Sequence, residues 1–113
     1  MGVKNKVLIN GELLTTSLVT LYEDQDNVQT RIVAFSVVNN DPSLSRTYDL
    51  HIVPDGESAS SSNIVVKGAA LFPSESEAVM EPINQIIPPG GSLVMKASAN
   101  SSIAVRASGI QFT

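Results

Sequence analysis

Turn-forming residues interrupt this chain at short, fairly regular intervals, and these interruptions limit which elements can form between them. They are built from Pro, Gly, Asn, Asp and Ser, which preset turn dihedrals, adopt positive φ or bond the neighbouring backbone. They fall at residues 10–11, 23–27, 39–45, 54–63, 73–76 and 88–91. Breaks with this spacing are typical of many short strands rather than helices, so the sequence predicts an all-β chain.

The segments between the breaks carry strand patterns. Residues 46–53 alternate between an apolar face and a face with Thr47, Asp49 and His51, which predicts a half-buried strand with a solvated face. Residues 29–38 carry apolar side chains on both faces, which predicts a strand covered on both sides. Further strands are expected over 13–22, 64–71 (or a short helical turn), 92–99 and 103–112, with two short strands or an extended edge in 77–87.

The last of these segments changes its apolar face. Ile103 and Val105 share one face, whereas Ile110 and Phe112 fall on the other. Gly109 lies between the two pairs and tolerates irregular backbone, so we expect a β-bulge there.

About eight strands in 113 residues close most simply into a two-sheet antiparallel sandwich, jelly-roll-like or immunoglobulin-like. We expect one sandwich domain over residues 13–113, preceded by an N-terminal arm or edge strand over residues 1–12.

The composition excludes several classes of function. With 42% hydrophobic and 16% charged residues, the chain is too apolar to be a disordered tail. A net charge of −4 leaves no basic stripe to neutralise phosphates, so nucleic acid is not an expected partner. No signal-peptide core follows the N-terminus, and no apolar run approaches the ~20 residues that span a bilayer. We expect a soluble protein without a membrane partner, made in the cytoplasm.

The sequence offers little for catalysis. His51 is the only histidine and cysteine is absent, which excludes a cysteine nucleophile and a thiolate metal site. Asp49 and Thr47 could form a small acid–base group with His51, but a lone histidine on a solvated face is more often simply exposed. Residues 23–27 resemble the start of a calcium loop without its glycine and closing glutamate, so a solvated hairpin connection is favoured. We expect no catalytic, cofactor-binding or metal-binding residue, and no enzyme.

Two other features favour contact with other protein subunits. Apolar residues on both faces of 29–38, together with the scarcity of charge, indicate more apolar surface than one small core needs. A separate feature, the serine-rich stretch 58–62, predicts a mobile exposed loop. The N-terminal lysines could dock on an acidic partner. The expected contact residues are Val3, Lys4, Lys6, Val7, Ile9, Ile32, Ala34 and Val38.

From Leu13 onward, several short segments follow one another in a characteristic order. They are residues 13–16 (Leu-Leu-Thr-Thr), Tyr22, 37–41 (Val-Val-Asn-Asn-Asp), 50–54 (Leu-His-Ile-Val-Pro), the serine-rich loop, 87–93, 96–99 and 105–109. This order and spacing resemble those of small bacteriophage virion proteins and fibre-head domains. Because the chain has no fibre shaft, heptad or collagen repeat, it looks more like a decoration (cement) protein of the phage head.

The resemblance implies a structural function without catalytic residues. A decoration protein binds the outer surface of the assembled capsid, so the implied partner is the major capsid protein and the implied location is the outside of the virion. A homo-oligomer, dimer or trimer, is also expected. The alternatives are a neck, tail or baseplate component, and a receptor- or carbohydrate-binding fibre-head domain. With no Trp and two Tyr, the chain is poorly supplied for stacking on sugars.

Overall fold

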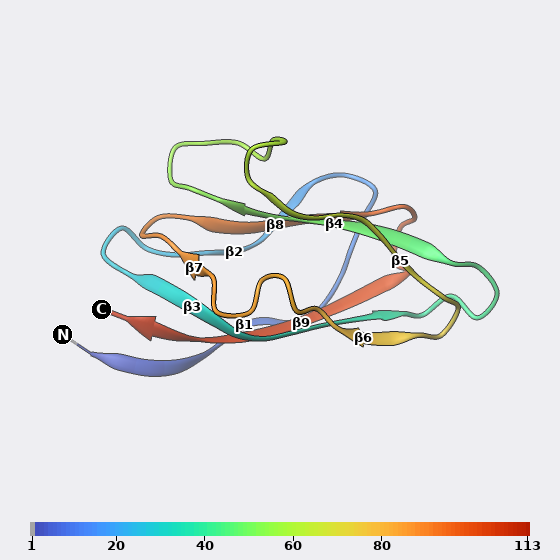
Figure 1. Cartoon of the computed structure of the whole chain (residues 1–113), viewed down its shortest axis with the longest axis horizontal. Coiled ribbons are helices and arrows are strands. Elements are labelled where there is room, and N and C mark those ends of the chain that lie inside the picture. The colour runs from blue at the N-terminus through green and yellow to red at the C-terminus, as the bar shows by residue number, and fades with distance from the viewer. Residues whose placement is uncertain (1) are drawn as a thin grey trace.

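The computed structural model describes residues 2–113, and every regular secondary-structure element in that range is a β-strand (Figure 1). In chain order they are β1 (Val3–Leu13), β2 (Val19–Glu23), β3 (Gln29–Asn39), β4 (Arg46–Val53), β5 (Ile64–Leu71), β6 (Ser76–Ala78), β7 (Ile86–Ile87), β8 (Ser92–Ala97) and β9 (Ile103–Phe112). The expected all-β, two-sheet antiparallel sandwich is confirmed.

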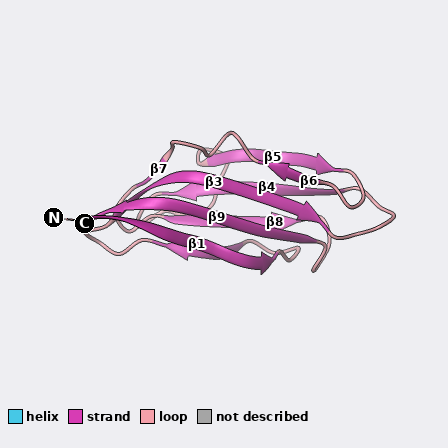
Figure 2. Cartoon of the chain, turned by 90° about the horizontal axis from the view of Figure 1, so that it is seen from below, coloured by secondary structure: helices cyan, strands magenta, loops and turns pink. Residues whose placement is uncertain are grey.

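The strands pair in a nested order. β1 pairs with β9, β2 with β8, β3 with both β6 and β7, and β4 with β5, all antiparallel. The first sheet has the order β1-β9-β3-β6, with β7 also on β3, and the second has the order β2-β8-β4-β5. Strands from the first half of the chain thus pair with strands from the second half, and successive pairs alternate between the two sheets (Figures 1 and 2). This is a jelly-roll-like arrangement.

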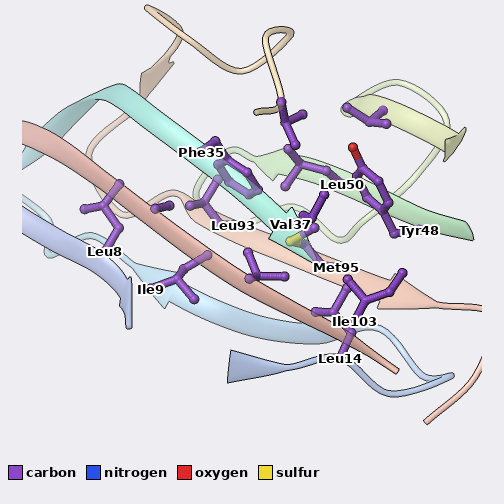
Figure 3. Packing of buried hydrophobic residues seen from close by; sticks show 14 of the residues in the cluster. Leu8, Ile9, Leu14, Phe35, Val37, Tyr48, Leu50, Leu93, Met95 and Ile103 are labelled. Atoms are coloured by element: carbon purple, nitrogen blue, oxygen red, sulfur yellow. The ribbon is translucent and has the colours of Figure 1, made fainter. Parts of the chain in front are cut away.

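The core lies between the two sheets and is mostly aliphatic (Figure 3). Leu50 and Met95 of the second sheet are fully buried, as are Val37 and Ile103 of the first. Inward-facing positions alternate with outward ones along β9, as packing of one sheet on another requires. Since the chain has only three Phe and two Tyr, β-branched and Leu side chains supply most of the buried volume.

A β-bulge in β3 exchanges the two faces of that strand. The register between β3 and β9 shifts between Ile32 and Ala34, which leaves Val33 as the extra residue. Ile32 before the bulge and Phe35 after it are therefore both buried. The prediction that residues 29–38 are covered on both sides is wrong, because the apolar positions change face at the bulge and the outer face stays exposed.

The predicted bulge at Gly109 is also wrong, since β9 keeps its alternation there and the two neighbouring strands bulge instead. β1 shifts register at Leu8, at nearly the same level as the shift in β3. A Cβ at Gly109 would lie 2.5 Å from the carbonyl oxygen of Arg31, 2.9 Å from Thr30 and 3.2 Å from Leu8. Both neighbouring strands thus approach β9 so closely here that only glycine fits.

The segment 13–22, predicted as one strand, is divided by a turn. β1 ends at Leu13 and β2 begins at Val19. Between them, the Thr15 hydroxyl donates to the carbonyl of Ser17 at 3.0 Å and accepts from its amide at 3.3 Å. The Thr15 hydroxyl thus bonds the local backbone, which stabilises a turn in place of a continuous strand.

Candidate interaction surface

The chain's own serine-rich loop covers part of the outer face of the β2-β8-β4-β5 sheet, around His51. His51 on this face is only 6% exposed, and its neighbour Val94 on β8 is buried beside it. Asn63, at the end of the loop, places its Oδ1 2.9 Å from His51 Nδ1 and also accepts from the Ser60 amide at 3.0 Å. The prediction that His51 is exposed on a solvated face is wrong, because the loop folds back over it.

This arrangement leaves His51 with a structural contact. An amide oxygen only accepts hydrogen bonds, so His51 Nδ1 is the protonated ring nitrogen and donates to Asn63. Asp49 is used elsewhere: its Oδ1 accepts from the Gly68 amide at 2.7 Å, and its Oδ2 lies 3.9 Å from Lys96 Nζ. The side chains of His51 and Asp49 are therefore each held by other partners and not by one another.

Residues 2–113 contain no group of three His, Cys, Asp or Glu side chains placed to hold a metal ion. The same residues include no helix of the length and apolarity needed to cross a membrane.

The acidic segment 23–27 differs from the predicted solvated connection, because Asp24 is buried between the sheets. Its Oδ1 accepts hydrogen bonds from the Tyr22 hydroxyl at 2.5 Å and the Thr30 hydroxyl at 2.8 Å, while Gln111 donates to the Tyr22 oxygen at 2.5 Å. Asp24 Oδ2 is buried without a partner. Burial raises the pKa of the Asp24 carboxyl. The cluster joins β2 to β3 and β9 at the end of the sandwich that holds the termini.

No segment of residues 2–113 covers the outer face of the β1-β9-β3 sheet (Figure 2). Val7 of β1 and Ala34 of β3 both pair with Ser108 of β9, so these residues form one row across the sheet. Val7 is 59% exposed, and the bulged Val33 is exposed beside it. Apolar side chains thus gather in the middle of an open face, as at protein–protein contact sites.

Two hollows flank this row. The central hollow, of about 510 Å³, extends toward β6 and is lined by Val7, Ile9, Val33, Ala34, Phe35, Ser36, Ala78, Val79, Met80, Ile83, Arg106, Ala107 and Ser108. The terminal hollow, of about 380 Å³, extends toward the chain ends and is lined by Asn5, Lys6, Val7, Val33, Ala34, Ser108, Gly109 and Ile110.

Charge is distributed unequally between this part of the sheet and the rest of the molecule. Strands β1, β3 and β9 contain four basic residues, Lys4, Lys6, Arg31 and Arg106, against one acidic residue, Glu12. Their net charge is +3, which leaves −7 for the rest of a chain whose total is −4. The three strands that form the open face are therefore basic in an otherwise acidic molecule, which favours acidic surfaces as partners.

Four of the predicted contact residues lie on or beside this face. Val7 and Ala34 occupy the row between the hollows. Val3 is 67% exposed near the start of β1, and Val38 is half-buried near the end of β3. The fold thus brings residues from both predicted segments onto one surface.

The other four are placed differently. Ile9 and Ile32 are buried in the core, so their predicted role as contact residues is corrected: the bulges in β1 and β3 turn them inward. Lys4 and Lys6 line a separate small hollow with Tyr22, at the edge between the two sheets. Lys6 also lines the terminal hollow, so it borders the open face as well.

Met80 and Ile83 also line the central hollow, and sequence reasoning missed them. Met80 is 68% exposed. Neither residue belongs to a strand, so no alternation marks them. The one available signal is their position on either side of Pro82, which excludes a continuous central strand.

Comparisons with known proteins identify a fold. No family model matches the chain, and no curated protein matches it. Among solved structures, a chain of the crystal structure of the T13 IBDV viral particle is similar, with a TM-score of 0.53 and 11% sequence identity. The similarity covers 97% of this chain and only 30% of that chain. At this identity the likeness extends to the two-sheet architecture alone.

Proposed function

We propose that this protein is a structural component of a virus particle, specifically a bacteriophage decoration (cement) protein on the outer surface of the head. The observation that carries the proposal is the open outer face of the β1-β9-β3 sheet, with exposed apolar residues at its middle. In this proposal, the major capsid protein contacts Val3, Val7 and the terminal hollow. The protein then acts by adding buried contacts between shell subunits, which requires no reacting group.

Such a contact stabilises the assembled shell more than its free subunits. Apolar surface removed from water contributes about 25 cal/mol per Å², before the costs of association are subtracted. Because a cement protein binds a site that only neighbouring subunits form, its binding shifts the equilibrium toward the assembled state by mass action. The excess of basic residues on the contact strands favours an acidic surface on the capsid.

The architecture supports a place in a virion. Jelly rolls are common in viral capsid proteins and also in lectins, and the similar solved chain comes from a viral particle. The order of the sequence segments resembles small phage virion proteins. A neck, tail or baseplate component would offer a similar face, but it would be present in few copies at one site rather than distributed over the shell.

The test is binding to heads that lack the protein. Val3→Asp places a charge on the proposed contact, whereas Leu18→Asp changes a similarly exposed residue outside it. We expect wild-type and Leu18→Asp protein to decorate the whole head and raise its disruption temperature, and Val3→Asp to bind at least about tenfold more weakly. Binding confined to the neck or tail in electron micrographs, or equal binding by Val3→Asp, would overturn the proposal.

A further inference from the structure

The loops before β4 and after β5 lie at the end of the sandwich opposite the termini (Figure 1). Each of these loops carries a large exposed apolar side chain. Phe72 follows β5 and is 71% exposed, and Leu44 precedes β4 and is 55% exposed. We call these two residues and their loops the tip. A phenyl ring this exposed gains little from its own fold, so the tip is a candidate contact surface.

Hydrogen bonds hold the two loops of the tip together. The buried Asn39 side-chain amide lies within hydrogen-bonding distance of the carbonyls of Leu44 at 3.0 Å, Leu71 at 3.2 Å and Phe72 at 3.1 Å. The Phe72 amide donates to Glu75 Oε1 at 2.7 Å. Phe72 and Leu44 are therefore presented side by side on a fixed backbone, which lowers the entropy lost on binding.

A second copy of the chain offers a matching surface. The central hollow is open and mainly apolar, with Met80 and Ile83 at its rim, and its volume of about 510 Å³ is ample for a phenyl ring and a leucine side chain. Charge favours the same pairing, because Arg106 lines the hollow while the Glu75 carboxylate stands beside Phe72. We infer that the tip of one copy docks into the central hollow of another.

The tip and the central hollow are different surfaces of the same molecule, so the interface is heterologous (head-to-tail). Repetition of such an interface produces closed rings or open chains of copies. The interface leaves Val3 and most of the terminal hollow free, and it does not depend on the proposed function. Because only a tip is buried, the area falls below the ~1,200 Å² of stable interfaces, and association in solution is weak. Copies held side by side on a surface would associate more strongly through their high effective concentration.

Cross-linking tests this directly, because the natural chain has no cysteine. Leu44→Cys on one copy is mixed with Met80→Cys on a second, and a short bifunctional maleimide is added. The matched control replaces Met80→Cys with Ser61→Cys, an exposed position in the loop over the other sheet. We expect the Leu44–Met80 pair to form the mixed dimer in clear excess over the control pair.

Adding Phe72→Ser to the Leu44→Cys copy removes the aromatic anchor and is expected to lower the mixed-dimer yield about tenfold. Since Phe72 is exposed, its replacement should leave the thermal unfolding midpoint nearly unchanged, which separates lost docking from lost folding. Equal yields with the control pair, insensitivity to Phe72→Ser, or a preference for Leu44–Leu44 dimers would overturn the inference. None of these outcomes depends on binding to heads, so the inference and the proposed function can fail separately.

Discussion

Replacing Gly109 with alanine tests the close approach of three strands directly. The added Cβ would lie 2.5 Å from the Arg31 carbonyl oxygen, against about 3.4 Å for an ordinary contact, and 2.9 Å from a Thr30 methyl carbon. The nearest atom belongs to the backbone of β3, so relief requires the strands to move apart by nearly 1 Å. Overpacking of this kind costs about 1–3 kcal/mol. For a chain of this size, that corresponds to a fall in Tm of roughly 4–12 °C.

Gly68→Ala is the matched control. Gly68 has φ of +61° with no atom within 4 Å of an added Cβ, so its replacement tests backbone strain without a clash. Its expected cost is about 1 kcal/mol. Gly109 is not among the residues with positive φ, so its replacement tests the clash alone. Both variants are compared by thermal and urea unfolding. A destabilisation of about 1 kcal/mol would already lower Tm by about 4 °C. A Tm for Gly109→Ala within about 2 °C of the wild-type value would therefore refute the argument from crowding.

Three further predictions follow from buried and paired groups. Burial raises the pKa of Asp24, so its contribution to stability is fully present below its ordinary pKa of 3.8 and is lost as the pH rises through the folded-state pKa. Asp24→Asn should flatten this dependence when the free energy of unfolding is measured from pH 3 to pH 8. Backbone amides and Arg46 lower the pKa of Asp41 to about 2. The stability that the Asp41 carboxylate contributes is therefore present above pH 3.8 and is lost as the pH falls toward 2. Asp41→Asn should remove this loss of stability at acid pH, measured by urea unfolding at each pH. Met95→Ala should lower the free energy of unfolding by about 2–5 kcal/mol, with an unchanged far-ultraviolet circular dichroism spectrum.

Local patterns in the sequence predicted most of the strands. Alternation placed β4, β8 and β9, and Pro82 correctly limited residues 77–87 to the short strands β6 and β7. The two-sheet architecture followed from the number and length of these segments. The inward and outward faces were harder to assign, because a bulge such as the one at Val33 inverts alternation without any local residue signal.

The contact surface could be predicted only in part for the same reason. Val7 and Ala34 were identified from their apolar pattern, and the pairing of both with Ser108 places them in one row. The burial of His51 depends on Asn63, twelve residues later, and no pattern within β4 indicates it. Long-range contacts of this kind are set by packing rather than by local preference.

The nested strand order also has a consequence for synthesis. β1 pairs with β9 alone, and the ribosome must deliver residues 103–112 before that pairing can form. Until then Leu8 and Ile9 have no covering strand, and β3 lacks its longest partner. Folding dominated by such distant pairings is slow, on the order of milliseconds to seconds. The nascent chain therefore cannot complete the first sheet until β9 is available to pair with both β1 and β3.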